Sequence, residues 1–110
     1  MTDKIVVLST CGTQEEADRL ATLLVEKRLA ACVNVLPGVQ SVYHWRGAVE
    51  RSQEFLLVIK SSRELFDRLC TALSTGHTYE TPEVIALPIV AGAEPYLEWL
   101  DRELNVPALR

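Results

Sequence analysis

The stretch AACVNVLPGVQSVYHWRGAVERSQEFLLVIK, residues Ala30–Lys60, has the pattern of one long β-hairpin. Its two arms flank Arg46-Gly47-Ala48, and a short loop that contains glycine is typical of a tight reversal between antiparallel strands. The second arm contains Phe55–Ile59, which is apolar on both faces and therefore predicts a central strand that is covered on both sides. Pro37-Gly38 interrupts the first arm, which indicates a bulge in an edge strand.

The segments on either side of this hairpin predict further strands and helices from their apolar periodicity. The expected strands cover residues 4–11 and 83–90, and the expected helices cover residues 13–28, 61–76 and 95–104. Thr13–Glu16 and Ser61–Glu64 both have the spacing of a capping box, and Gly76 suits the position that follows a helix.

The resulting order is β-α-β-β-α-β followed by a terminal helix. Two β-α-β crossovers that flank a hairpin predict an α+β protein with the ferredoxin-like split βαβ topology. The chain of 110 residues suits a single domain, and we expect that domain to span residues 1–110.

Composition excludes several classes of function. The net charge of −4 and the absence of a Lys/Arg cluster argue against nucleic-acid binding, and no apolar run approaches the roughly 20 residues of a membrane span. The N-terminus does not have the pattern of a signal peptide, and the three widely spaced cysteines predict reduced thiols in the cytoplasm. Sequence motifs of hydrolases, zinc proteases and nucleotide-binding loops are missing, so we do not expect an enzyme.

The length of the hairpin predicts self-association. Arms of up to fifteen residues exceed the roughly 5–6 residues of an average strand, so the turn should project beyond the helices. Tyr43 and Trp45 lie near that turn, where a single domain has little to cover them. Long strand edges and exposed aromatic residues favour pairing with another chain, and we expect a homo-oligomer.

The loop after the second helix carries the most suggestive polar cluster, with His77, Tyr79, Glu80 and Glu83 around Pro82. Imidazole and carboxylate three residues apart can meet at one cation, although a stable site needs three or four ligands. Spacing alone favours a plainer interpretation, in which His77 ends the helix, Tyr79 packs on a neighbour and the glutamates are solvated.

Cysteine and lysine residues allow further alternatives. Cys11 ends a strand and suits either a site or the core, whereas Cys32 and Cys70 are expected in the core. Lys60 and Glu54 flank the central strand, where an inward lysine would need a carboxylate partner. An ordinary ion pair at the end of a strand is the interpretation we favour for Lys60.

Five stretches, in order and in register, resemble the CutA divalent-cation tolerance family: RLAACVNV (residues 28–35), YHWRG (43–47), EFLLVIK (54–60), HTYETPEVI (77–85) and YLEW (96–99). The resemblance covers nearly the whole chain. It implies ferredoxin-like subunits that form a stable trimer related in architecture to PII signalling proteins. It also implies a role in tolerance to copper and other divalent metals, in the cytoplasm for bacterial members, and it carries no reaction and no organic cofactor.

The chain departs from this family at positions that matter for metal binding. The family's usual His-Pro-Tyr-Glu loop reads His77-Thr78-Tyr79-Glu80. In some bacterial members the copper ligands are a cysteine and two adjacent histidines at positions that read Ser9, Gly76 and His77 here. We therefore formulate the hypothesis that Cys11, on the same strand face as Ser9, replaces the thiolate, with Glu80 as a third ligand.

Two functions follow as expectations. The first is a homotrimer for divalent-cation tolerance, with a weak site for copper or another divalent cation at the metal ligands His77, Glu80 and Cys11. The alternative is a PII-like signalling module that binds a small anion or metabolite in a cleft between subunits. The residues expected to line that cleft are Trp45, Glu54, Lys60, Tyr79 and Glu83.

Overall fold

The computed structural model describes residues 2–104, which form the predicted order of strands and helices. The elements are β1 (Lys4–Cys11), α1 (Gln14–Glu26), β2 (Cys32–Trp45), β3 (Ala48–Ser62), the 3₁₀ turn η1 (Arg63–Leu65), α2 (Phe66–Gly76), β4 (Ile85–Pro88) and α3 (Glu94–Leu104). The predicted domain of residues 1–110 extends beyond this description at both ends, at residue 1 and at residues 105–110.

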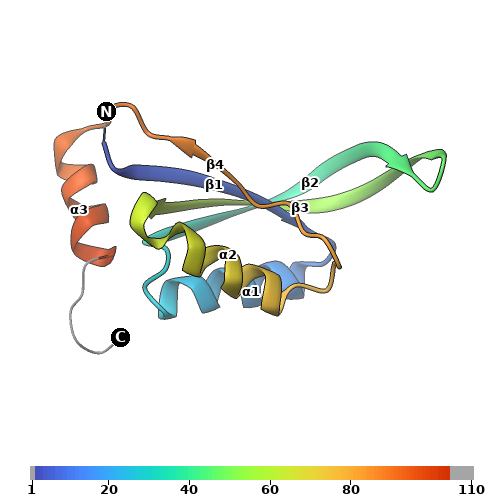
Figure 1. Cartoon of the computed structure of the whole chain (residues 1–110), viewed down its shortest axis with the longest axis horizontal. Coiled ribbons are helices and arrows are strands. Elements are labelled where there is room, and N and C mark those ends of the chain that lie inside the picture. The colour runs from blue at the N-terminus through green and yellow to red at the C-terminus, as the bar shows by residue number, and fades with distance from the viewer. Residues whose placement is uncertain (1, 105–110) are drawn as a thin grey trace.

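The four strands form one sheet in the order β2-β3-β1-β4, and each neighbouring pair is antiparallel (Figure 1). The predicted ferredoxin-like α+β fold is therefore confirmed. β3 lies between β2 and β1, as its apolar run Phe55–Ile59 predicts, and β2 and β4 form the two edges.

The hairpin turn has the geometry that its sequence predicts. Trp45 pairs with Ala48 across a two-residue loop, in which Arg46 has φ 52° and Gly47 has φ 83°. Positive φ at both positions is typical of the type I′ turn, whose twist matches that of the flanking strands. The register of β2 shifts between Leu36 and Val39, which confirms the predicted bulge. Beyond the bulge the two strands project past the helices as a ribbon (Figure 1).

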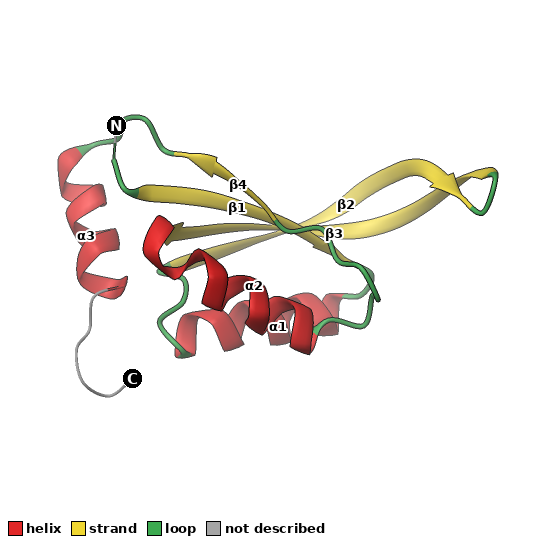
Figure 2. Ribbon diagram, viewed as in Figure 1, coloured by secondary structure: helices red, strands yellow, loops and turns green. Residues whose placement is uncertain are grey.

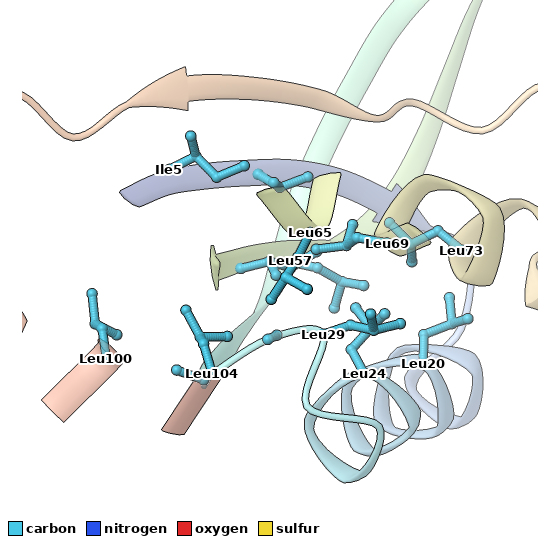
Figure 3. Packing of buried hydrophobic residues seen from close by; sticks show 14 of the residues in the cluster. Ile5, Leu20, Leu24, Leu29, Leu57, Leu65, Leu69, Leu73, Leu100 and Leu104 are labelled. Carbon is cyan, nitrogen blue, oxygen red and sulfur yellow. The ribbon is translucent and has the colours of Figure 1, made fainter. Parts of the chain in front are cut away.

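Helices α1 and α2 lie together on one face of the sheet, and α3 lies at its end (Figure 2). Alternate residues of β1 and β3 point toward the helices and meet their leucines in one core (Figure 3). The fully buried members of this core include Val7, Leu20, Leu24, Leu57, Ile59, Leu69, Leu73 and Leu100. Each buried leucine contributes roughly 1.5–3 kcal/mol through loss of apolar contact with water.

The opposite face of the sheet carries no helix within residues 2–104 (Figure 2). We call it the open sheet face and define it by register as Val6 and Leu8 of β1, Leu56 and Val58 of β3, and Ile85 and Leu87 of β4. The β1 and β3 members are half-buried by their neighbours, whereas Ile85 and Leu87 are each 50% exposed. Thr10 and Lys60 lie on the same face by this register, so it is largely but not wholly apolar. An apolar sheet surface of this kind is unusual for an isolated subunit.

The first predicted capping box is half correct. The Glu16 amide donates to Thr13 Oγ1 at 3.1 Å and closes the start of α1. The Glu16 carboxylate, however, accepts hydrogen bonds from Thr78 in the loop after α2 instead of completing the box.

Two predictions about the start and end of α2 are wrong. Ser61–Glu64 is not a capping box, because β3 continues to Ser62 and the buried Ser61 hydroxyl donates to the Leu29 carbonyl at 2.6 Å. Gly76 is the last helical residue and not the residue after the helix. A Cβ atom on Gly76 would lie 3.1 Å from Leu20 Cδ2, so close packing of the two helices explains the glycine.

Candidate functional site at the loop after α2

The loop that follows α2 crosses the end of β1, where His77 anchors it. His77 Nε2 lies 2.8 Å from the Thr10 carbonyl oxygen, and the Tyr79 amide lies 3.0 Å from His77 Nδ1. An amide can only donate, so Nδ1 is the acceptor and Nε2 carries the proton that Thr10 accepts. The imidazole side chain is fully buried. Both ring nitrogens are therefore engaged, and neither offers a free lone pair to a metal.

Glu16 fixes the next residue of the loop. Its carboxylate accepts hydrogen bonds from the Thr78 amide at 2.7 Å and from the Thr78 hydroxyl at 3.2 Å, and it lies 3.5 Å from His77 Nδ1. Burial alone would raise the pKa of Glu16, but these hydrogen bonds outweigh burial and lower the pKa below its usual value. Glu16 is thus held as a buried carboxylate that positions the loop.

Glu54 is a second buried carboxylate that positions the loop, and it lies on the side opposite Glu16. It is 7% exposed, and its two oxygens accept hydrogen bonds from the Tyr79 hydroxyl at 2.7 Å and from the Ser41 hydroxyl at 2.5 Å. Burial raises the pKa of the Tyr79 phenol, and the hydrogen bond to Glu54 raises it further. The Tyr79 hydroxyl also passes close over Gly12, where an added Cβ atom would lie 3.3 Å away.

Cys11 lies beneath this polar cluster and is fully buried. Burial and the neighbouring carboxylates of Glu16 and Glu54 raise the pKa of its thiol to about 11. The thiolate is the form that binds soft metals, and at neutral pH Cys11 is almost entirely a thiol. Of the other cysteines, Cys32 and Cys70 are only partly buried, although the core was expected for both.

The residues predicted as metal ligands are not brought together within one chain. His77 is engaged by backbone groups, Cys11 is a buried thiol and Glu80 is exposed on the loop. Among residues 2–104, no group of three or more His, Cys, Asp or Glu side chains is placed where it could hold a metal ion. The side chains of a single subunit therefore do not fit a complete metal site.

The residues predicted to line a cleft are likewise separated in one subunit. Glu54 accepts a hydrogen bond from Tyr79. Lys60, however, lies six residues beyond Glu54 on β3, which corresponds to about 20 Å at the rise of a strand. Lys60 donates to the Asn34 side-chain oxygen, and within residues 2–104 it has neither the predicted carboxylate partner nor the predicted ion pair. Trp45 lies beside the hairpin turn and is 57% exposed, and Glu83 is exposed.

The hydrogen bond between Tyr79 and Glu54 is expected to contribute to the stability of the fold. Tyr79→Phe should lower the free energy of unfolding by about 1 kcal/mol, because Glu54 keeps Ser41 but loses one donor. Urea denaturation at fixed protein concentration measures this loss. Tyr96→Phe is the matched control, since no hydrogen bond to the Tyr96 hydroxyl occurs in the described chain; an equal loss in both variants would contradict the expectation.

The fold and the loop together define a class of protein: a ferredoxin-like α+β subunit with a projecting β-ribbon and a loop fastened between two buried carboxylates. The family model of the CutA1 divalent ion tolerance protein matches residues 5–103. The chain belongs to this family.

Relatives and solved structures agree with this assignment. The divalent-cation tolerance protein CutA of Thermus thermophilus is 46% identical over 95 residues, which cover 86% of this chain and 92% of that protein. The chloroplastic protein CutA of Arabidopsis thaliana is 47% identical over 96 residues, 87% of this chain and 53% of that protein. The crystal structure of CutA from Xylella fastidiosa superimposes with a TM-score of 0.93 at 38% identity and covers 94% of this chain and all of that one.

The chain spans about half the length of the Arabidopsis relative, which is named chloroplastic. No helix within residues 2–104 is both long enough and apolar enough to cross a membrane.

Proposed function

We propose that the protein is a cytoplasmic homotrimer that provides tolerance to copper or another divalent cation without catalysing a reaction. The observation that carries the assembly is the amount of apolar surface that one subunit leaves uncovered. Trp45 and Val49 on the ribbon are 57% and 58% exposed, in addition to the open sheet face. Two relatives that match over nearly their whole length are named divalent-cation tolerance proteins, which supports the cellular role.

In this proposal, association covers both the projecting ribbon and the open sheet face. The edge strands β2 and β4 present unpaired backbone groups, and a closed ring of subunits removes such edges. The open sheet face includes Ile85 and Leu87 of the edge strand β4, so in this proposal a neighbour that packs at this edge also covers these two side chains. The ribbon projects past the helices (Figure 1), and in this proposal it contacts that neighbour.

Cation binding in this proposal is weak and shared. The exposed carboxylate of Glu80 is the ligand that one subunit contributes from the loop, and side chains of a neighbouring subunit complete the coordination. Cys11 contributes no ligand in this proposal, because its side chain is fully buried. His77 acts as the residue that holds the loop in place, since its nitrogens are bonded to Thr10 and Tyr79.

Sedimentation and calorimetry test the two parts of the proposal separately. We expect sedimentation velocity at micromolar concentration to give the mass of three chains. In titrations of copper into protein without an affinity tag, we expect a Kd above about 1 µM, about fivefold weaker binding for Glu80→Gln and no change for Cys11→Ser. A monomer would overturn the assembly, and unchanged affinity in Glu80→Gln would overturn the site.

A further inference from the structure

A groove runs between α1 and α2 in the helix layer, on the opposite side of the sheet from the open sheet face. Its volume is about 840 Å³, within the roughly 300–1,000 Å³ of small-molecule sites. Side chains of both helices and of the segment after α1 line it. The groove contains neither the loop after α2 nor the ribbon, so an inference about it does not depend on the proposed function.

One part of the groove is apolar. Leu23 and Ala72 line it from the two helices and are partly buried, and the buried Leu29 lines it from the segment after α1. Thr75 and Gly76, at the end of α2, also line the groove. These side chains suit an apolar body of the size of a short acyl chain or an aromatic ring system.

The other part of the groove is basic. Helices α1 and α2 run antiparallel (Figure 1). Lys27 and Arg28 follow α1 and Arg68 lies in the first turn of α2, so the three cations line the groove from the same end of the helix pair. Arg28 is paired with Glu103 at 2.9 Å. Neither Lys27 nor Arg68 forms an ion pair within the described part of the chain. Glu26 is the one acidic residue that lines the groove.

Arg68 is not explained by the stability of the subunit, whereas Lys27, at the C-cap of α1, complements the helix dipole and Arg28 is paired with Glu103. The chain as a whole has a net charge of −4, so a local excess of positive charge runs against its average. Arg68 stands near the N-terminus of α2, where the helix dipole disfavours a cation. Unpaired cations next to an apolar wall are complementary to a ligand that has a negative head and an apolar body.

We propose that this groove binds an amphipathic organic anion. The apolar body lies between Leu23 and Ala72, and a carboxylate or sulfonate group is bound by Lys27 and Arg68. Arg28 contributes less to this site, because Glu103 already neutralises it.

Calorimetric titration of the full-length protein tests the proposal with three probes: dodecanoate, anilinonaphthalene sulfonate and dodecyltrimethylammonium. We expect both anions to bind about tenfold more tightly than dodecyltrimethylammonium, whose alkyl chain matches that of dodecanoate. We expect the difference to shrink as salt is raised from 0.01 to 1 M, because salt screens exposed charges. Equal affinity for the anion and the cation with the same chain would overturn the proposal.

Substitutions of the cations that line the groove test whether the anion binds there. Lys27→Gln/Arg68→Gln should weaken dodecanoate binding about tenfold, and Arg68→Gln alone should weaken it by less. Arg102→Gln is the matched control, since Arg102 is also an exposed helical arginine but lies on α3, outside the groove. An equal loss in Arg68→Gln and Arg102→Gln would overturn the proposal. So would methyl NMR shifts at Ile85 and Leu87 of the open sheet face with none at Leu23.

Discussion

Glu16→Ala is expected to lower the free energy of unfolding by about 3 kcal/mol. The carboxylate is 4% exposed and accepts two hydrogen bonds from Thr78. Removing it takes away the charged acceptor of the Thr78 amide and hydroxyl, and each hydrogen bond to a charged group is worth about 1.5–3 kcal/mol. Urea denaturation at a single protein concentration, which holds any assembly constant, measures the loss.

Glu15→Ala is the matched control for this experiment. Glu15 precedes Glu16 in the first turn of α1 but is exposed, so its replacement should change the free energy of unfolding by less than about 0.5 kcal/mol. Glu16→Gln should fall between the two, because its amide oxygen still accepts a hydrogen bond from Thr78. Similar stability of the Glu15 and Glu16 variants would show that the loop does not depend on this carboxylate.

The stabilisation by Glu16 should also depend on pH. Its pKa is lowered in the folded protein, so the folded state binds fewer protons at this site than the unfolded chain does. The contribution is therefore fully present above the unfolded pKa of about 4.3 and is lost as the pH falls through the folded pKa. We expect the difference between wild type and Glu16→Ala to shrink below about pH 4.3.

Local patterns predicted most of the fold because they report which surfaces are covered. The run Phe55–Ile59 indicated a central strand covered on both faces; β3 is central in the sheet, but within residues 2–104 helices cover only one of its faces (Figure 2). The interruption at Pro37-Gly38 and the turn at Gly47 were visible because these residues adopt backbone conformations that others avoid. The start of α2 was predicted wrongly, because Ser61 is a strand residue whose hydroxyl serves a carbonyl distant in sequence.

The site was harder to predict, because its bonds join distant parts of the chain. Glu16 was assigned to a capping box, and nothing in its spacing indicates Thr78 as its partner. The bond between Glu54 and Tyr79 likewise spans two elements, although both residues were expected near a shared cleft. Cys11 was predicted on the correct strand face, but the burial that makes it a poor metal ligand arises only when the helices cover that face.

Leu87→Asp on the open sheet face is expected to abolish the trimer that we propose. Leu87 is 50% exposed in a single chain, so aspartate at this position is tolerated by the isolated subunit. In an assembly that covers the open sheet face, the same carboxylate would lose its water without gaining a partner, at a cost of several kcal/mol per subunit. Sedimentation velocity at micromolar concentration should therefore give the mass of one chain.

Val25→Asp separates this effect from the mere addition of charge. Val25 is 41% exposed, but it lies on α1 in the helix layer, away from the open sheet face. We expect this variant to keep the mass of three chains, and circular dichroism should show a folded subunit in both variants. If Leu87→Asp still sediments as a trimer, the open sheet face is not the interface. If both variants dissociate, added negative charge and not burial controls assembly, which would show that the sheet face has no special role.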